Sequence, residues 1–154
     1  MSITGQIKFF EPSQNLEVNG ATATASTGND AVQYLLDRNV DTKWRSLASS
    51  DATTETITIT FDEDKTIDRI FLMDHNFKSL VIKYDVLGVW THFANVTGFN
   101  GSTANLTDTA TTSTSYYEFT QVTTGSIQIT VTTTQVANDE KYCSQVICTS
   151  EIAT

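Results

Sequence analysis

One segment of the chain alternates polar and apolar residues without a break, Thr56-Ile57-Thr58-Ile59-Thr60-Phe61. Successive side chains of a β-strand point to opposite faces, so a period of two predicts a strand with one face in a core and the other in solvent. Shorter segments of similar character, separated by turn residues, recur at residues 21–26, 67–73, 80–86, 90–93, 116–119, 126–132 and 142–147. About eight short strands of this kind predict an all-β, antiparallel β-sandwich.

The rest of the chain predicts connections between these strands. Helical character is confined to residues 30–37, which are too few for more than one or two turns. The charged run 62–65 indicates a turn, and residues 95–115, rich in Asn, Thr, Ser and Gly, predict long loops around a weak strand. Residues 1–20 are either an N-terminal extension or a first strand. A chain of 154 residues fits a single domain spanning residues 1–154.

The charge of the chain bears on its partners. Nine Lys and Arg face 18 Asp and Glu, which gives a formal net charge of -9. Nucleic-acid binding depends on clustered cations that release counterions from phosphates, and the cations here are few and scattered. We therefore expect no nucleic-acid partner. The acidic balance suits a soluble surface, a cation site or a basic patch on a protein neighbour, and charge alone does not separate these three.

The chain also lacks sequence signals for export and membrane insertion. No basic N-terminal stretch is followed by an apolar run, and no apolar run has the length of a membrane span. We therefore expect a protein that is made in the cytoplasm without a Sec-type signal. It then stays in the cytoplasm, leaves by cell lysis, or becomes part of a larger particle such as a virion.

Neither the cysteines nor the histidines indicate a reactive centre. Cys143 and Cys148 are five residues apart in one expected strand, and this odd spacing turns their side chains to opposite faces. We expect two buried thiols and no disulfide. His75 and His92 lie near no recognisable Ser or Cys nucleophile motif, and no phosphate-binding glycine loop occurs. The sequence therefore predicts a protein that is not an enzyme.

A set of landmarks occurs in a fixed order along the chain. They are an alanine-rich strand at 21–25, the acidic loop Leu36-Asp37-Arg38-Asn39, the tripeptide Thr42-Lys43-Trp44, and the hairpin Val81-Ile82-Lys83-Tyr84 with Gly88 and Trp90. This order resembles the discoidin family, the coagulation-factor C-type or galactose-binding-like domains, over about residues 21–148. Arg38 is a departure, because the family usually has glycine there. The resemblance implies a jelly-roll sandwich.

The resemblance also implies a structural calcium ion. In the family, the loop before the buried tryptophan often binds Ca²⁺ through carboxylate and carbonyl oxygens, and Asp37, Asn39 and Thr42 match those positions. The acidic residue that the family offers near its C-terminus corresponds to Ser144 or Gln145 here, which removes a negative charge from the site. The alternative is a loop closed without metal by Asx-type hydrogen bonds from its side chains to its backbone.

Other residues are candidates for the core or for a contact surface. Trp44 and Trp90 occupy motif positions where tryptophan belongs to the core, so we expect structural roles for both rather than sugar stacking. His75 and Asn76 fall between two expected strands, where they can bind a sugar hydroxyl or satisfy a turn. Four aromatic residues near strand ends are candidates for an exposed contact patch, with packing at the edge of the core as the alternative. They are Phe77, Phe93, Phe99 and Tyr116.

Two functions from different classes fit these features. The first is a structural or interaction subunit of a bacteriophage-like virion, in a tail, baseplate, fibre or capsid decoration, that packs against other virion proteins or copies of itself. Its motivation is the acidic, Thr-rich composition and the similarity of the strand end at residues 70–76 to small stand-alone phage proteins of this fold. The alternative is a carbohydrate-binding module that recognises galactose-like sugars on cell-surface glycans through loops at 75–78 and 93–117.

Overall fold

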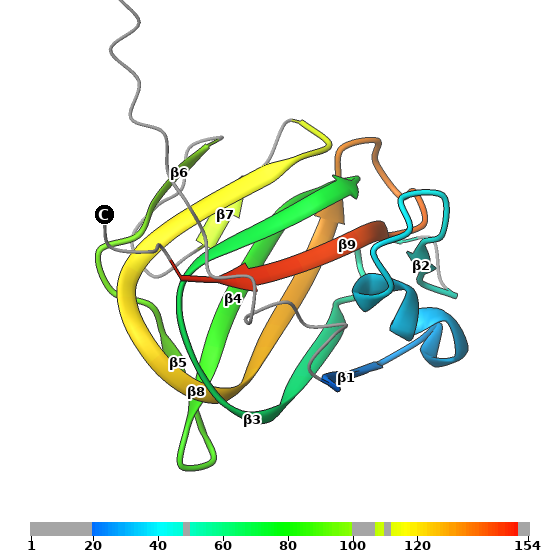
Figure 1. Cartoon of the computed structure of the whole chain (residues 1–154). Coiled ribbons are helices and arrows are strands. Elements are labelled where there is room, and N and C mark those ends of the chain that lie inside the picture. The colour runs from blue at the N-terminus through cyan, green and yellow to red at the C-terminus, as the bar shows by residue number, and fades with distance from the viewer. Residues whose placement is uncertain (1–19, 48–49, 100–106, 110–111, 151–154) are drawn as a thin grey trace, which may run out of the picture.

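The computed structural model describes residues 20–47, 50–99, 107–109 and 112–150 (Figure 1). Within these ranges nine strands form one hydrogen-bonded, antiparallel sheet, together with a 3-10 helix. The predicted all-β class is therefore confirmed. The elements are β1 (Thr22–Ala25), η2 (Asn29–Leu36), β2 (Trp44–Arg45), β3 (Glu55–His75), β4 (Phe77–Val86), β5 (Val89–His92), β6 (Thr97–Phe99), β7 (Thr107–Thr109), β8 (Ser115–Thr134) and β9 (Tyr142–Thr149).

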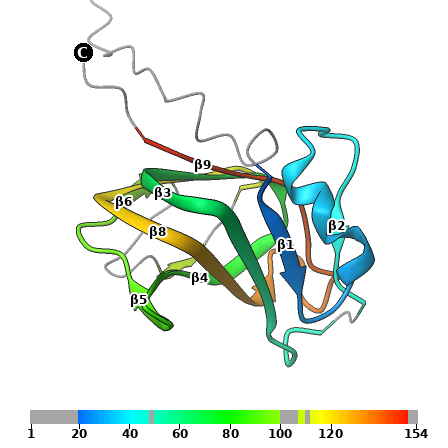
Figure 2. The ribbon, with the colours of Figure 1, turned by 60° about the horizontal axis from the view of Figure 1, so that its bottom comes forward.

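The long strands β3 and β8 turn this single sheet into a sandwich. They pair with each other over most of their length and bend together, so that the sheet folds over itself (Figures 1 and 2). The register shifts between the pairs Thr60 with Ser126 and Lys65 with Thr124. The charged turn predicted at 62–65 is therefore wrong, because β8 bends alongside and the chain stays extended through the corner. For the same reason the strands predicted at 116–119 and 126–132 are one strand, β8.

Each layer of the sandwich takes one half of both long strands. The second half of β3 and the first half of β8 form one layer with β9 and β6. The first half of β3 and the second half of β8 form the other layer with β1, β4, β5 and β7. β2 extends the first layer by pairing with β9, and η2 lies beside β1, β2 and β9 (Figure 2).

The core fills the space between the layers. The period-two pattern of β3 places Ile57 and Ile59 there, and the predicted core residues Ile67, Ile70 and Leu72 are also fully buried. Burying side chains of this size contributes about 1.5–3 kcal/mol each, so the inward faces of β3 and β8 supply much of the stability. Both cysteines are buried free thiols, as expected, and burial raises the pKa of Cys143 to about 12 and the pKa of Cys148 still further.

The two tryptophans differ in burial. Trp44 is fully buried, as predicted, and its ring meets Phe77 edge-on with 6.4 Å between the ring centroids. Trp90 is only partly buried, which corrects the expectation that it belongs to the core. The physical reason is its strand: β5 lies at the edge of the sheet and pairs only with β4. Across the described ranges, no helix combines the length and apolar character that crossing a membrane requires.

The hairpin between β4 and β5 turns through two residues with positive φ, Leu87 at 51° and Gly88 at 87°. Such two-residue turns favour Asn-Gly, and a left-handed backbone costs an ordinary residue about 1–2 kcal/mol. The Leu87 side chain is 100% exposed, so no packing compensates for that cost. We expect Leu87→Asn to raise the free energy of unfolding by about 1 kcal/mol, measured by urea denaturation. Leu47→Asn, at an exposed leucine without positive φ, is the control, and equal effects of the two substitutions would contradict the explanation.

Candidate functional site

The polar pair predicted as a ligand contact is buried. Only one residue separates β3 from β4, so His75, Asn76 and Phe77 pass through the edge of the core instead of forming a loop; their exposed fractions are 1%, 6% and 0%. The Asn76 amide donates to the carbonyl of Glu140 (2.6 Å), and its carbonyl oxygen accepts the amide N–H of Tyr142 (2.9 Å). Asn76 is therefore satisfied by backbone groups, which is the alternative to a sugar contact. Burial of both His75 and Asn76 corrects the expectation that they contact a sugar.

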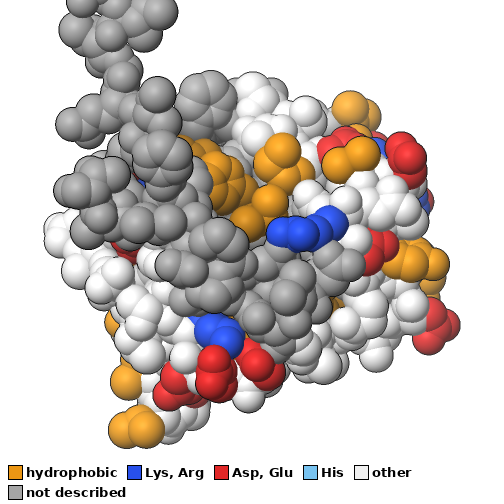
Figure 3. All heavy atoms as spheres, viewed as in Figure 1, with side chains coloured by type: hydrophobic (Ala, Val, Ile, Leu, Met, Phe, Trp, Pro, Cys, Tyr) orange, Lys and Arg blue, Asp and Glu red, His pale blue; other side chains and the backbone are white. Residues whose placement is uncertain are grey.

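The predicted aromatic residues do not form one patch. Phe93 is fully buried, with ring centroids 4.9 Å from Tyr84 and 4.0 Å from Phe119, so Phe77 and Phe93 belong to the core. Tyr116 instead lies half-buried on the outer face of β8, 4.8 Å from the Phe71 ring. Figure 3 shows apolar side chains gathered on this outer face. The side chain of Phe99 lies outside the described residues.

The three residues that the resemblance implies as calcium ligands do come together in the loop 37–42. The Asp37 carboxylate accepts the backbone N–H of Asn39 (2.8 Å) with one oxygen and the hydroxyl of Thr42 (2.7 Å) with the other. The Asn39 side-chain oxygen accepts the backbone N–H of Asp41 (3.1 Å). These contacts are the Asx-type closure named as the alternative to a metal site.

The donor set of this loop does not fit calcium. Ca²⁺ takes six to eight oxygens, with carboxylates supplying the charge. Here both oxygens of Asp37 already accept hydrogen bonds, Asp41 is exposed, and the residue on β9 that corresponds to the family's acidic residue is Ser144 or Gln145, neither of which is charged. Among the described residues no group of three His, Cys, Asp or Glu side chains is close enough to bind a metal ion. The hydrogen bonds of the loop favour its closure without metal, and a calcium ion at Asp37, Asn39 and Thr42 stays a prediction from the resemblance.

A different site lies at the end of the sandwich that carries η2 and β2. An open pocket of about 510 Å³ is lined by the turn 26–31, by 45–47 and by Glu140 from the connection between β8 and β9. These three segments are far apart in the sequence. They meet because β2 pairs with β9, which sets Trp44 opposite Cys143 and Arg45 opposite Tyr142. Since Trp44 points into the core, its neighbours Lys43 and Arg45 point away from it.

Buried side chains fix the position of the pocket wall formed by the turn 26–31. The hydroxyls of Ser26 and Thr27 both donate to one carboxylate oxygen of the buried Glu55, and the Trp44 indole N–H donates to the carbonyl of Thr27 (3.1 Å). At Gly28, with φ 64°, an added Cβ would lie 2.0 Å from the carbonyl oxygen of Arg45. Only glycine therefore lets this turn approach β2 so closely.

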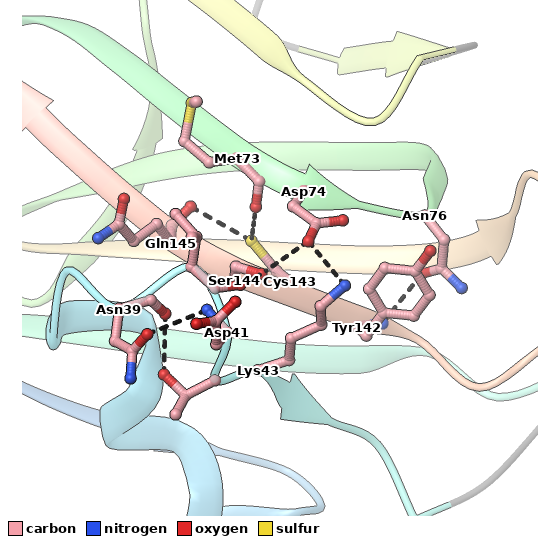
Figure 4. Close-up of polar contacts among 12 residues, drawn as sticks. Asn39, Asp41, Lys43, Met73, Asp74, Asn76, Tyr142, Cys143, Ser144 and Gln145 are labelled. Carbon is pink, nitrogen blue, oxygen red and sulfur yellow. Dashed lines mark hydrogen bonds and ion pairs between the residues drawn. The ribbon is translucent and has the colours of Figure 1, made fainter.

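The opposite wall carries the charged groups of Arg45 and Glu140, and an aromatic ring lies next to Arg45. Arg45 Nη1 and Glu140 Oε1 are 3.7 Å apart, and these side chains are 52% and 35% exposed. At that distance a ligand hydroxyl can accept from the guanidinium while it donates to the carboxylate. The half-buried ring of Tyr142 has its centroid 5.1 Å from Arg45 Cζ. On the same ring, the Lys43 ammonium is 4.7 Å from the centroid (Figure 4). Donors, an acceptor and an aromatic ring are the groups with which proteins bind sugars.

Sequence reasoning did not identify Arg45, Glu140 or Tyr142 as candidates. One local signal was available for Arg45: it follows the buried Trp44 in a strand, so alternation turns its side chain outward. No local signal links it to Glu140 and Tyr142, which are about a hundred residues further along the chain. Their proximity is a product of strand pairing.

The fold is shared with solved carbohydrate-binding modules. The family 32 module of C. perfringens NanJ in complex with galactose matches with a TM-score of 0.71 at 15% identity, covering 94% of this chain and 100% of that chain. Chitosan-binding module 1 of a Paenibacillus sp. IK-5 chitosanase/glucanase matches with a TM-score of 0.69 at 18% identity, covering 89% and 98%.

Part of a larger enzyme also matches. A putative α-L-fucosidase from Bacteroides thetaiotaomicron has a TM-score of 0.69 at 14% identity, covering 91% of this chain and 29% of that chain. This chain thus spans less than a third of the fucosidase. No protein-family model matches the sequence, and no curated protein matches it. At these identities the likeness shows the fold alone: the chain has the β-sandwich fold of the discoidin-like, galactose-binding-like modules.

Proposed function

We propose that this chain is a non-catalytic carbohydrate-binding module that takes a galactose-like sugar in the pocket formed by 26–31, 45–47 and Glu140. The observation that carries the proposal is the pair Arg45 and Glu140 in the lining of the pocket, with the ring of Tyr142 beside Arg45. The guanidinium and carboxylate are too far apart to bond tightly to each other, and both remain accessible beside an aromatic ring. A pair of sugar hydroxyls can bridge these two groups while the apolar face of the sugar contacts the ring.

The comparisons support this class of function. This chain covers nearly the whole length of a module in complex with galactose and of a chitosan-binding module, whereas it covers a small part of a fucosidase. The pocket is open and shallow enough for the end of a glycan chain, and we expect weak single-site binding that gains strength through several copies on one surface.

A glycan array followed by calorimetric titration of the best sugar tests the proposal. We expect Arg45→Ala to weaken binding at least about tenfold, which corresponds to about 1.4 kcal/mol, because the sugar loses a charged donor. Lys78→Ala is the matched control, since it also removes one exposed cation but lies on β4 outside the pocket. Equal affinities of wild type and Arg45→Ala, or no binding to any galactose-like glycan, would rule out this site.

A place in a bacteriophage-like virion stays a prediction from the sequence. The proposed sugar site does not depend on it, since a virion subunit can carry a receptor-binding face. Mass spectrometry of purified particles tests the location directly, because a structural subunit is present in every particle while a cytoplasmic protein is lost on purification.

A further inference from the structure

The loop 37–42 is joined to two other segments by a short chain of polar contacts. The Lys43 ammonium is 2.7 Å from one oxygen of the Asp74 carboxylate at the end of β3. The Ser144 hydroxyl on β9 is 3.1 Å from that same oxygen and 3.3 Å from the backbone carbonyl of Val40 in the loop. Figure 4 shows Lys43, which immediately precedes β2, and Ser144 on β9 converging on Asp74. The loop, β3 and β9 are therefore connected through a single carboxylate.

Two carbonyl oxygens of the loop lie near donor groups of the protein. The Asn39 carbonyl accepts the backbone N–H of Thr42 (3.2 Å), and the Val40 carbonyl lies 3.3 Å from the Ser144 hydroxyl. Backbone carbonyls that turn inward in a tight loop need donors or a cation, because leaving them unpaired costs free energy. Here groups of the protein itself lie within hydrogen-bond distance of the Asn39 and Val40 carbonyls.

A lysine of the chain supplies a positive charge at this junction. The hydrogen bond from Lys43 holds the pKa of the Asp74 carboxyl below its usual range, against partial burial, which raises it. Asp74 has φ 48°, so β3 adopts a left-handed conformation at the residue that meets the ammonium. Two independent features, the ion pair and the backbone turn, thus place a carboxylate against Lys43.

We propose that the ammonium of Lys43 performs in this chain the structural role that a calcium ion would perform beside the loop 37–42. It joins the loop to the ends of β3 and β9 through Asp74 and Ser144, and it does so without a metal. The inference does not rest on the proposed sugar binding, because all of its contacts lie within the protein and concern how the loop is held.

Thermal unfolding of the purified protein, in EDTA and in millimolar calcium, tests this assignment. For the wild type we expect the same Tm in both solutions and no saturable heat of calcium binding in a calorimetric titration. Lys43→Met keeps an unbranched apolar side chain but removes the ammonium, which lies 4.7 Å from the Tyr142 ring centroid, and we expect it to lower Tm by about 2–4 °C in both solutions. Lys78→Met, at an exposed lysine of β4, is the matched control and leaves Tm unchanged.

Two further variants separate the ion pair from a general loss of packing. Asp74→Asn combined with Lys43→Met is expected to lower Tm by less than the sum of the single changes, since the two side chains act as one unit. Lys43→Arg keeps the positive charge and should stay close to the wild type, which also secures the test if Lys43→Met folds poorly. A Tm of the wild type raised by several degrees in calcium, or strictly additive single changes, would overturn the proposal.

Discussion

Replacing Gly28 by alanine lowers the free energy of unfolding by about 3 kcal/mol or more, because two penalties combine at this position. The left-handed backbone, with φ 64°, disfavours any residue with a Cβ. The added Cβ also lies 2.0 Å from the Arg45 carbonyl oxygen, and backbone in a paired strand cannot move aside as a flexible side chain can. Urea denaturation measures the loss, and sugar binding should weaken with it because Gly28 and Arg45 line the same pocket.

Gly88→Ala is the matched control for this prediction. Gly88 has a positive φ of 87°, but no heavy atom lies within 4 Å of an added Cβ. The substitution there costs only the backbone term, about 1 kcal/mol. The difference between the two variants isolates the close approach of the β1–η2 turn to β2. Equal losses at the two glycines would show that the turn can move and that the pocket wall is not rigid.

Lowering the pH from 7 to 4 removes about 3 kcal/mol of stability through His75 alone. Burial lowers the pKa of His75 from 6.5 to about 4, against the nearby Asp74 carboxylate, which raises it. The unfolded chain therefore binds a proton below pH 6.5 that the folded chain does not accept. Stability from this group is full above pH 6.5 and is lost progressively as the pH falls towards 4.

The hydrogen bonds of His75 explain why the folded protein resists this proton. Its Nδ1 accepts the backbone N–H of Phe77 (3.1 Å), so the ring carries its hydrogen on Nε2, which donates to the Ser115 hydroxyl (2.8 Å). A proton on Nδ1 would break the bond to Phe77 and bury a charge next to the core. The imidazole is thus a neutral structural group, in contrast to the ligand contact expected from its position between two strands.

Urea denaturation at several pH values between 7 and 4 measures the effect of His75. His75→Gln cannot titrate, so its stability should depend much less on pH in this range, even though the variant is less stable throughout. His92→Gln, at the exposed histidine of β5, should keep the pH dependence of the wild type. A steep loss of stability that persists in His75→Gln would assign the effect to another group.

Local patterns in the sequence predicted the positions of the strands better than the connections between them. Alternation in residues 56–61 reports burial on one face, and that face does lie in the core. Whether residues 62–65 make a turn depends on β8, which is some sixty residues away and bends in step with β3. The charged run carries no information about that partner. In the sequence, a corner at which two long strands bend together therefore has the same pattern as two separate strands joined by a turn.

The candidate site was harder to predict than the fold, for a related reason. Trp44 and Trp90 have similar motif contexts, yet one lies beneath η2 and the pocket and the other on an edge strand. His75 and Asn76 were candidates for ligand contacts because they are polar residues between two expected strands. In the structure β4 follows β3 almost directly, so both side chains are buried. Arg45 and Glu140 had no distinguishing pattern, because their role arises from the pairing of β2 with β9 and not from their neighbours in the sequence.

The pairing of β2 with β9 also sets an order of events during folding. β1, η2 and β2 leave the ribosome first, but the strand that β2 pairs with is the last of the described strands to be synthesised. Until β9 is in place, Arg45 has no Tyr142 beside it and the pocket has one wall only. Contacts between such distant segments form slowly, since a long loop must close first. The complete pocket therefore forms late, once the rest of the described domain has folded.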